Sequence, residues 1–142
     1  MRDAKASSES AGHTDTQRHA GEEDALHFAV AVARLADSLK TEQIQVLDLR
    51  GLSALADFFV IGTGTSDRQM RAVLDAVQDY ARGLGRRPFS TTHTASTSWV
   101  LADYVDVVIH LFDEEHRDYY DLDGLWGDAP RVEWRPDTPS AS

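Results

Sequence analysis

Apolar residues recur every three or four positions in two stretches of the chain, which is the period of an amphipathic helix. The first stretch covers residues 24–39 and the second covers residues 67–84. Just ahead of the second stretch, Ser66 and Gln69 have the spacing of a capping box, and Gly85 follows it as a helix-ending residue. The sequence therefore predicts two helices.

Four shorter runs have the composition of β-strands. They are residues 44–49, 57–61, 99–103 and 106–112. The second run is nearly all apolar, which predicts a strand covered on both faces. Tyr104 and Val105 leave a very short connection between the last two runs, which predicts an antiparallel hairpin. We expect an α/β fold in which a mixed β-sheet is packed with helices.

The two ends of the chain lack any hydrophobic period. Residues 1–23 and 135–142 are polar, and such segments bury too little apolar surface to offset the entropy lost on ordering. We expect both to be disordered tails. The remaining residues, 24–134, are expected to form one domain, because 42% apolar content is enough for a single core.

Charge points to the class of partner. The chain has 24 acidic against 14 basic residues and a formal net charge of −10, which argues against a broad face for nucleic acid. From Asp103 to Asp128 there are nine carboxylates and one base, Arg117. Tyr119, Tyr120 and Trp126 are interleaved with the acids of this segment. Aromatic and acidic side chains together predict binding to a basic protein.

Other classes are excluded by what the sequence lacks. There is no cysteine, so disulfides and thiolate metal sites are ruled out. No apolar run approaches the roughly 20 residues that span a bilayer. The N-terminal residues contain acids and no apolar signal-peptide core. We expect a soluble cytoplasmic protein.

The loop from Gly62 to Ser66 raises the possibility of a nucleotide site, since it lies between a strand and a helix N-terminus. A phosphate-binding P-loop needs a lysine that is absent here, and Asp67 would oppose a phosphate. Nucleotidyl transfer would need clustered carboxylates, whereas Asp103 and Asp106 flank a turn. We favour a tight turn with a helix cap. A nucleotide-binding or nucleotidyltransferase-like enzyme that uses this loop is the alternative.

Two histidines stand near carboxylates, but their spacing matches no established metal site. His110 and His116 are separated by the acidic residues 113–115. Because His110 falls within a strand, we interpret it as a hydrogen-bonded, half-buried residue of the sheet. No nucleophile motif is present either. The sequence predicts no catalytic residue, cofactor or metal, and hence no enzyme.

Five segments in order resemble the ribosomal silencing factor family, also called Iojap-like or RsfS. They read V-L-D-L-R-G-L-S from Val46, A-D-F-F-V-I-G-T-G-T-S-D-R-Q from Ala56, W-V-L-A-D-Y from Trp99, D-V-V-I-H-L-F from Asp106, and R-D-Y-Y-D-L-D-G-L-W-G-D-A-P from Arg117. The resemblance implies a nucleotidyltransferase-like topology that lacks the catalytic carboxylates. It also implies a translational repressor that binds large-subunit ribosomal protein L14. Such a repressor sterically blocks joining of the ribosomal subunits when nutrients are limiting, and is often a homodimer when free.

Six residues are expected to contribute to the protein-binding face on these grounds. They are Trp99, Leu101, Asp103, Tyr104, Tyr119 and Tyr120. The chain departs from the family pattern at Val105, where the family usually has glycine. A β-branched residue disfavours a positive φ angle, so we expect the hairpin turn to be built differently here. The loop of residues 91–98 also differs from the family's Glu-Gly, and no contact is inferred from it.

Overall fold

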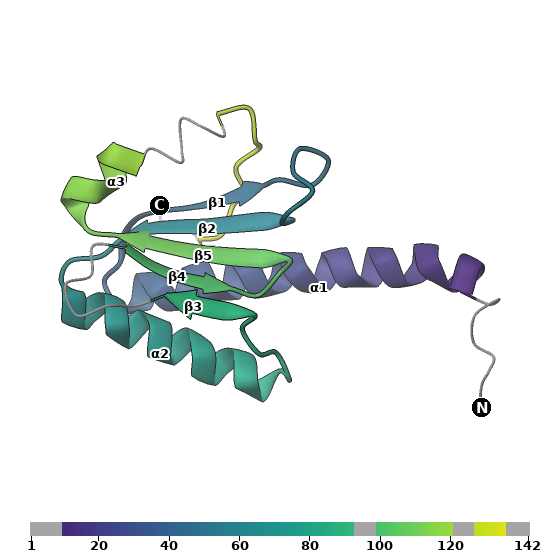
Figure 1. Cartoon of the computed structure of the whole chain (residues 1–142), viewed down its shortest axis with the longest axis horizontal. Helices are drawn as coiled ribbons and strands as arrows, with labels where there is room; N and C mark the ends of the chain where they lie inside the picture. The colour runs from purple at the N-terminus through teal and green to yellow at the C-terminus, as the bar shows by residue number, and fades with distance from the viewer. Residues whose placement is uncertain (1–9, 93–98, 121–126, 136–142) are drawn as a thin grey trace, which may run out of the picture.

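Five strands and three helices make up the part of the chain that the structure describes (Figure 1). This computed structural model describes residues 10–92, 99–120 and 127–135, with side chains for residues 24–92, 99–117 and 127–135. In chain order the elements are α1 Ser10–Ser38, β1 Glu42–Asp48, β2 Phe58–Thr63, α2 Asp67–Gly83, β3 Ser90–Thr92, β4 Trp99–Asp103, β5 Val107–Phe112 and α3 Glu114–Tyr120.

The strands form one mixed sheet, as the sequence predicts, in the order β1-β2-β5-β4-β3. Strands β2 and β5 are parallel, and the other neighbouring pairs are antiparallel. Helices α1 and α2 pack against the same face of the sheet and against each other (Figure 1). The predicted hairpin of β4 and β5 is confirmed, with Asp103 opposite Val108.

The core lies between the helices and this face. Alternation along β5 directs Val107, Ile109 and Leu111 into it, where they meet Phe28 of α1 and Met70 of α2. Residues on the other face of the sheet form a smaller buried cluster, namely Leu47, Leu49, Ile61, Phe112 and Ala129. Strand β2 is therefore covered on both sides, which confirms the expectation from its apolar run.

The ends of α2 also agree with the sequence. The Ser66 hydroxyl accepts the Gln69 backbone N–H at 3.0 Å, which caps the helix N-terminus. At the other end Gly85 has a φ of 78°, and its N–H donates to the Arg82 carbonyl at 3.0 Å. A glycine adopts that left-handed conformation without steric cost, so it ends the helix.

Three elements differ from the sequence prediction. Helix α1 begins at Ser10, well before the apolar period that starts near residue 24. Its first part projects past the sheet (Figure 1), and the sequence has no apolar period there. Strand β3 and helix α3 were not predicted. Of the predicted tails, 1–23 and 135–142, residues 1–9 and 136–142 lie outside the described residues, and the domain limits stay a prediction.

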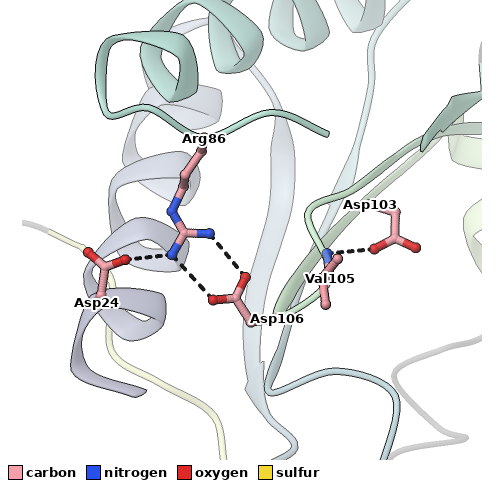
Figure 2. A network of polar contacts seen from close by, with 5 residues as sticks. All are labelled: Asp24, Arg86, Asp103, Val105 and Asp106. Atoms are coloured by element: carbon pink, nitrogen blue, oxygen red, sulfur yellow. Dashed lines mark hydrogen bonds and ion pairs between the residues drawn. The ribbon is translucent and has the colours of Figure 1, made fainter. Parts of the chain in front are cut away.

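One arginine joins three separate parts of the chain (Figure 2). The Arg86 guanidinium donates to the Asp24 carboxylate of α1 at 2.7 Å and to the Asp106 carboxylate after the β4–β5 turn at 3.0 Å. It also lies 4.4 Å from the centre of the Phe28 ring. These contacts hold α1 and the loop after α2 against the end of the sheet where β4 and β5 are joined.

The β4–β5 turn keeps a left-handed residue although valine occupies it. Val105 has a φ of 77°, which a β-branched residue disfavours, and the expectation of a differently built turn stays a prediction. The Asp103 carboxylate accepts the Val105 N–H at 2.7 Å (Figure 2), and the Tyr104 N–H donates to the Val107 carbonyl at 2.9 Å. These hydrogen bonds hold a conformation that strains a β-branched residue by about 1–3 kcal/mol.

Val105→Gly should therefore raise the free energy of unfolding by about 1 kcal/mol, because relief of the strain exceeds the added chain entropy of glycine. The Val105 side chain is 60% exposed, so its removal sacrifices little burial. Urea unfolding of both proteins gives the difference. Val105→Ala serves as the control and should show a smaller gain. A loss of stability in Val105→Gly would contradict a strained turn.

Candidate protein-binding face

Alternation along β4 places Trp99, Leu101 and Asp103 on the face of the sheet that α1 and α2 do not cover. All three are partly exposed. Across the β4–β5 ladder they pair with Phe112, His110 and Val108, respectively. The structure thus brings three of the six predicted residues together in one row along the strand, and we call this the Trp99 face.

Aromatic rings form the centre of the Trp99 face. The Trp99 ring stacks nearly parallel to the His110 ring at 6.1 Å and to the Phe112 ring at 5.9 Å between centroids. From the other side, Phe59 meets His110 edge to face at 4.6 Å. Neither Phe59 nor Phe112 is among the residues predicted for binding. The short hairpin turn was the available signal, because it fixes which residues of β5 lie beside Trp99.

His110 is more buried than the sequence suggested. It is 7% exposed, and within the described part of the chain neither ring nitrogen has a hydrogen-bond partner. Burial lowers the pKa of His110 to about 4. The interpretation as a half-buried, hydrogen-bonded residue is therefore wrong. The ring is a neutral spacer between aromatic side chains of β2 and β4.

Tyr104 does not belong to the Trp99 face. It lies in the core on the helix side, 5% exposed, with its ring edge to face with Phe28 at 5.1 Å. Burial raises the pKa of the Tyr104 hydroxyl, although the nearby Arg82 and Arg86 act in the opposite direction. Tyr104 directly follows Asp103, so continued alternation places it on the helix side with Val100 and Ala102.

Helix α3 carries Tyr119 and Tyr120, whose side chains lie outside the described residues. The helix contacts β5, the strand from which it continues. Its Arg117 is buried and donates to the Thr63 hydroxyl of β2 at 2.8 Å. The Asp113 carboxylate accepts the His116 N–H at 2.8 Å and caps the helix. The two tyrosines remain predicted contributors to binding.

The loop from Gly62 to Ser66 uses its backbone amides within the protein. The Gly64 N–H donates to the Phe112 carbonyl at 2.7 Å, and the Thr65 N–H donates to the Gln69 side chain at 3.0 Å. A Cβ on Gly64 would overlap the Met70 side chain, so the glycine permits close packing of the loop on α2. This geometry favours the tight turn with a helix cap.

The described residues show neither a metal-ligand cluster nor a membrane-spanning helix. No three histidine or carboxylate side chains in that part of the chain lie close enough together to hold a metal ion. His116 pairs with Asp113 at 2.8 Å, while His110 is enclosed by aromatic rings. No helix within the described ranges is long and apolar enough to cross a bilayer.

Comparison with known proteins decides the family. Residues 22–142 match the family described as "Ribosomal silencing factor during starvation". The chain belongs to this family. It is 40% identical to ribosomal silencing factor RsfS of Bacillus subtilis over 98 residues, which are 69% of this chain and 83% of that protein. It is also 36% identical to the chloroplastic protein Iojap of Zea mays over 118 residues, 81% of this chain and 50% of that protein.

Two crystal structures share the fold of this RsfS-family chain. A protein from Bacillus halodurans is 34% identical with a TM-score of 0.64, and the match covers 78% of this chain and 98% of that one. A protein from Chromobacterium violaceum is 28% identical with a TM-score of 0.66, covering 83% and 95% respectively. The family resemblance and the mixed α/β fold are thus confirmed.

Proposed function

We propose that this chain binds ribosomal protein L14 on the large ribosomal subunit and sterically blocks joining of the two subunits. Membership of the RsfS family supports a ribosome-associated role in silencing translation. The observation that carries the finer proposal is the Trp99 face, where Trp99, Leu101 and Asp103 lie together beyond the cover of α1 and α2. The ribosome also makes the cytoplasm the expected location.

The chemistry of this face suits a basic protein. A broad indole supplies contact area at little cost in side-chain entropy, and a nearby carboxylate orients lysine or arginine of the partner. Asp103 lies two positions from Leu101, which lies two positions from Trp99, so both kinds of group point from one strand. Blocking by occupation of a surface requires no cofactor, and we propose none.

We also propose that the chain is not an enzyme and that its topology is nucleotidyltransferase-like without the catalytic carboxylates. In the Gly62 to Ser66 loop, the Gly64 and Thr65 amides donate hydrogen bonds within the protein. The enzyme alternative predicts micromolar binding of ATP or GTP with magnesium in calorimetry. Such binding would overturn this part of the proposal.

Sedimentation with separated ribosomal subunits tests the main proposal. The protein should migrate with the large subunit, and its addition before the small subunit should lower the yield of joined ribosomes. Binding to large subunits that leaves joining unchanged would contradict the steric mechanism. Absence from the large-subunit fraction at low salt would contradict ribosome binding by the free chain.

We further propose that the free chain is a homodimer that associates through the end of the sheet where α1 projects. Five large apolar side chains are exposed there, which we call the strand-end rim: Leu52, Leu55, Leu84, Phe89 and Val105. Hydrogen bonds from Asp57 to Asp106 and from Phe89 to Asp103 bring their loops to this end. The acids Asp24, Asp48 and Asp106 at this end pair with arginines. Two chains of charge −10 meet with least repulsion at such a surface.

Leu55→Glu should raise the dimer dissociation constant at least tenfold. The Leu55 side chain is 87% exposed, so the change leaves the fold intact but puts a charge into the proposed contact. Sedimentation equilibrium over a range of concentrations measures the effect. Ala72→Glu adds the same charge to an exposed position of α2 and should leave association unchanged. Equal dimerisation of both variants would exclude the rim.

A further inference from the structure

A polar pocket of about 640 Å³ lies beside the first residues of β1, between α3 and the C-terminal segment. Three arginines line it, Arg117, Arg131 and Arg135, together with the side chains of Gln43 and Gln45. We propose that this pocket binds a phosphate group of an RNA backbone. Such a contact goes beyond protein binding by the Trp99 face, and it rests on the proposed function for the source of the RNA.

The charges of Arg131 and Arg135 are available to a ligand. The Arg131 guanidinium donates to the Ala129 carbonyl at 2.9 Å, and the Arg135 guanidinium lies 4.7 Å from the centre of the Trp134 ring. Neither forms an ion pair with a carboxylate of the described residues. Among the described residues, Glu133 is the one carboxylate that lines the pocket. Arg131 and Arg135 therefore outnumber the acid among these residues and make a local positive site on an acidic chain.

Hydrogen bonds fix two walls of the pocket. Arg117 is 6% exposed and its guanidinium donates to the Thr63 hydroxyl, which in turn donates to the Gln43 side chain at 3.1 Å. On the other wall, the Trp134 indole N–H donates to the Ile44 carbonyl at 3.2 Å. The guanidinium groups therefore project from a fixed frame, which reduces the entropy lost when a phosphate binds.

The ligand is better described as backbone phosphate than as a free nucleotide. Base recognition needs an aromatic face for stacking, and Trp134, the one aromatic residue that lines the pocket, is 4% exposed and has Arg135 over its ring. Arginine and amide donors without a stacking surface suit phosphate oxygens. Contacts to phosphate oxygens carry no information about base sequence. Because the whole chain is acidic, binding should be short-ranged and modest in affinity.

The position of the pocket agrees with contact to the same ribosomal subunit. Trp99 pairs with Phe112, which pairs with Thr63, which pairs with Glu42 at the start of β1. Three strand spacings separate the two ends of this row, or about 14 Å. A ribosomal protein on the Trp99 face would therefore have the pocket beside it, within reach of RNA that surrounds that protein.

Fluorescence anisotropy with a labelled single-stranded RNA of about 12 nucleotides tests the proposal at low salt. Binding by the full chain should weaken as salt rises, with a log–log slope near −1.4 for about two phosphate contacts. The double variant Arg131→Ala/Arg135→Ala should bind at least tenfold more weakly and reduce the slope by about 1.4. Arg131→Lys/Arg135→Lys keeps the charges and should recover most of the affinity.

Arg68→Ala/Arg87→Ala is the matched control, since it removes two exposed arginines that do not line the pocket. It should retain affinity within about threefold. Equal loss in both double variants, or no RNA binding by the wild type, would overturn the proposal. So would tight binding of pyrophosphate or ATP at the arginines without RNA binding, which would indicate a small-molecule site. The assay contains no ribosomal protein, so its failure would leave the Trp99 face untouched.

Discussion

Trp99→Ala should weaken binding to the large subunit by about 2 kcal/mol or more, which is roughly a thirtyfold rise in the dissociation constant. The indole stacks on His110 and Phe112 and is partly exposed, so it presents a rigid ring to a partner. Its truncation removes the largest side chain of the proposed contact. Co-sedimentation at several protein concentrations measures the change.

Tyr80→Ala is the matched control for loss of an aromatic side chain. Tyr80 is 40% exposed and lies on α2, in the helix layer that packs on the opposite face of the sheet. It should bind large subunits as the wild type does. Thermal unfolding of both variants distinguishes lost contact from lost fold. A folded Trp99→Ala protein that binds normally would remove Trp99 from the binding face.

His110→Leu should make the protein more resistant to acid. The folded-state pKa of His110 is about 4, below its ordinary value of 6.5, so the unfolded chain binds more protons between these two values. The stability that depends on neutral His110 is present above pH 6.5 and is lost as the pH falls towards 4. Between pH 7 and pH 4.5 the loss amounts to about 2 kcal/mol.

Urea unfolding at both pH values measures this contribution as a difference between wild type and variant. The wild type should lose about 2 kcal/mol more than His110→Leu on acidification, because other titrating groups are common to both proteins. His27→Gln replaces an exposed histidine of α1 and should follow the wild type. If His110→Leu loses as much stability as the wild type, His110 titrates normally in the folded protein.

Local patterns were sufficient to predict the part of the face built by β4 and β5. Alternation over residues 99–103 and the short turn at Tyr104 place Trp99 and Leu101 on one side, and both features are visible in the sequence. The cap at Ser66 and the end at Gly85 follow from equally local rules. Strand β3 consists of three exposed Ser and Thr residues, so no apolar residue marked it.

Contacts between distant segments explain what the sequence did not reveal. The environment of His110 comes from Trp99 on β4 and Phe59 on β2, and only the first neighbour follows from the short hairpin turn. Arg117 stood out as a lone base among acids, but its contact with Thr63 spans 54 positions of the chain. The pocket that includes Arg117 also needs the C-terminal segment, which lies beside β1 through the Leu47 and Arg131 bridge.

The parallel pairing of β2 with β5 also sets the order in which the sheet can form. The β1–β2 and β4–β5 ladders join strands that are neighbours in sequence. In contrast, Phe58 of β2 pairs with Val107 of β5, and α2, β3 and β4 lie between them in the sequence. Such a non-local pair forms slowly, because loop closure must precede its contacts. During synthesis β2 therefore remains an open edge until β5 has left the ribosome. The Trp99 face lies on β4 and its aromatic neighbours come from β2 and β5, so a growing chain gains its binding surface only after its last strand has been made.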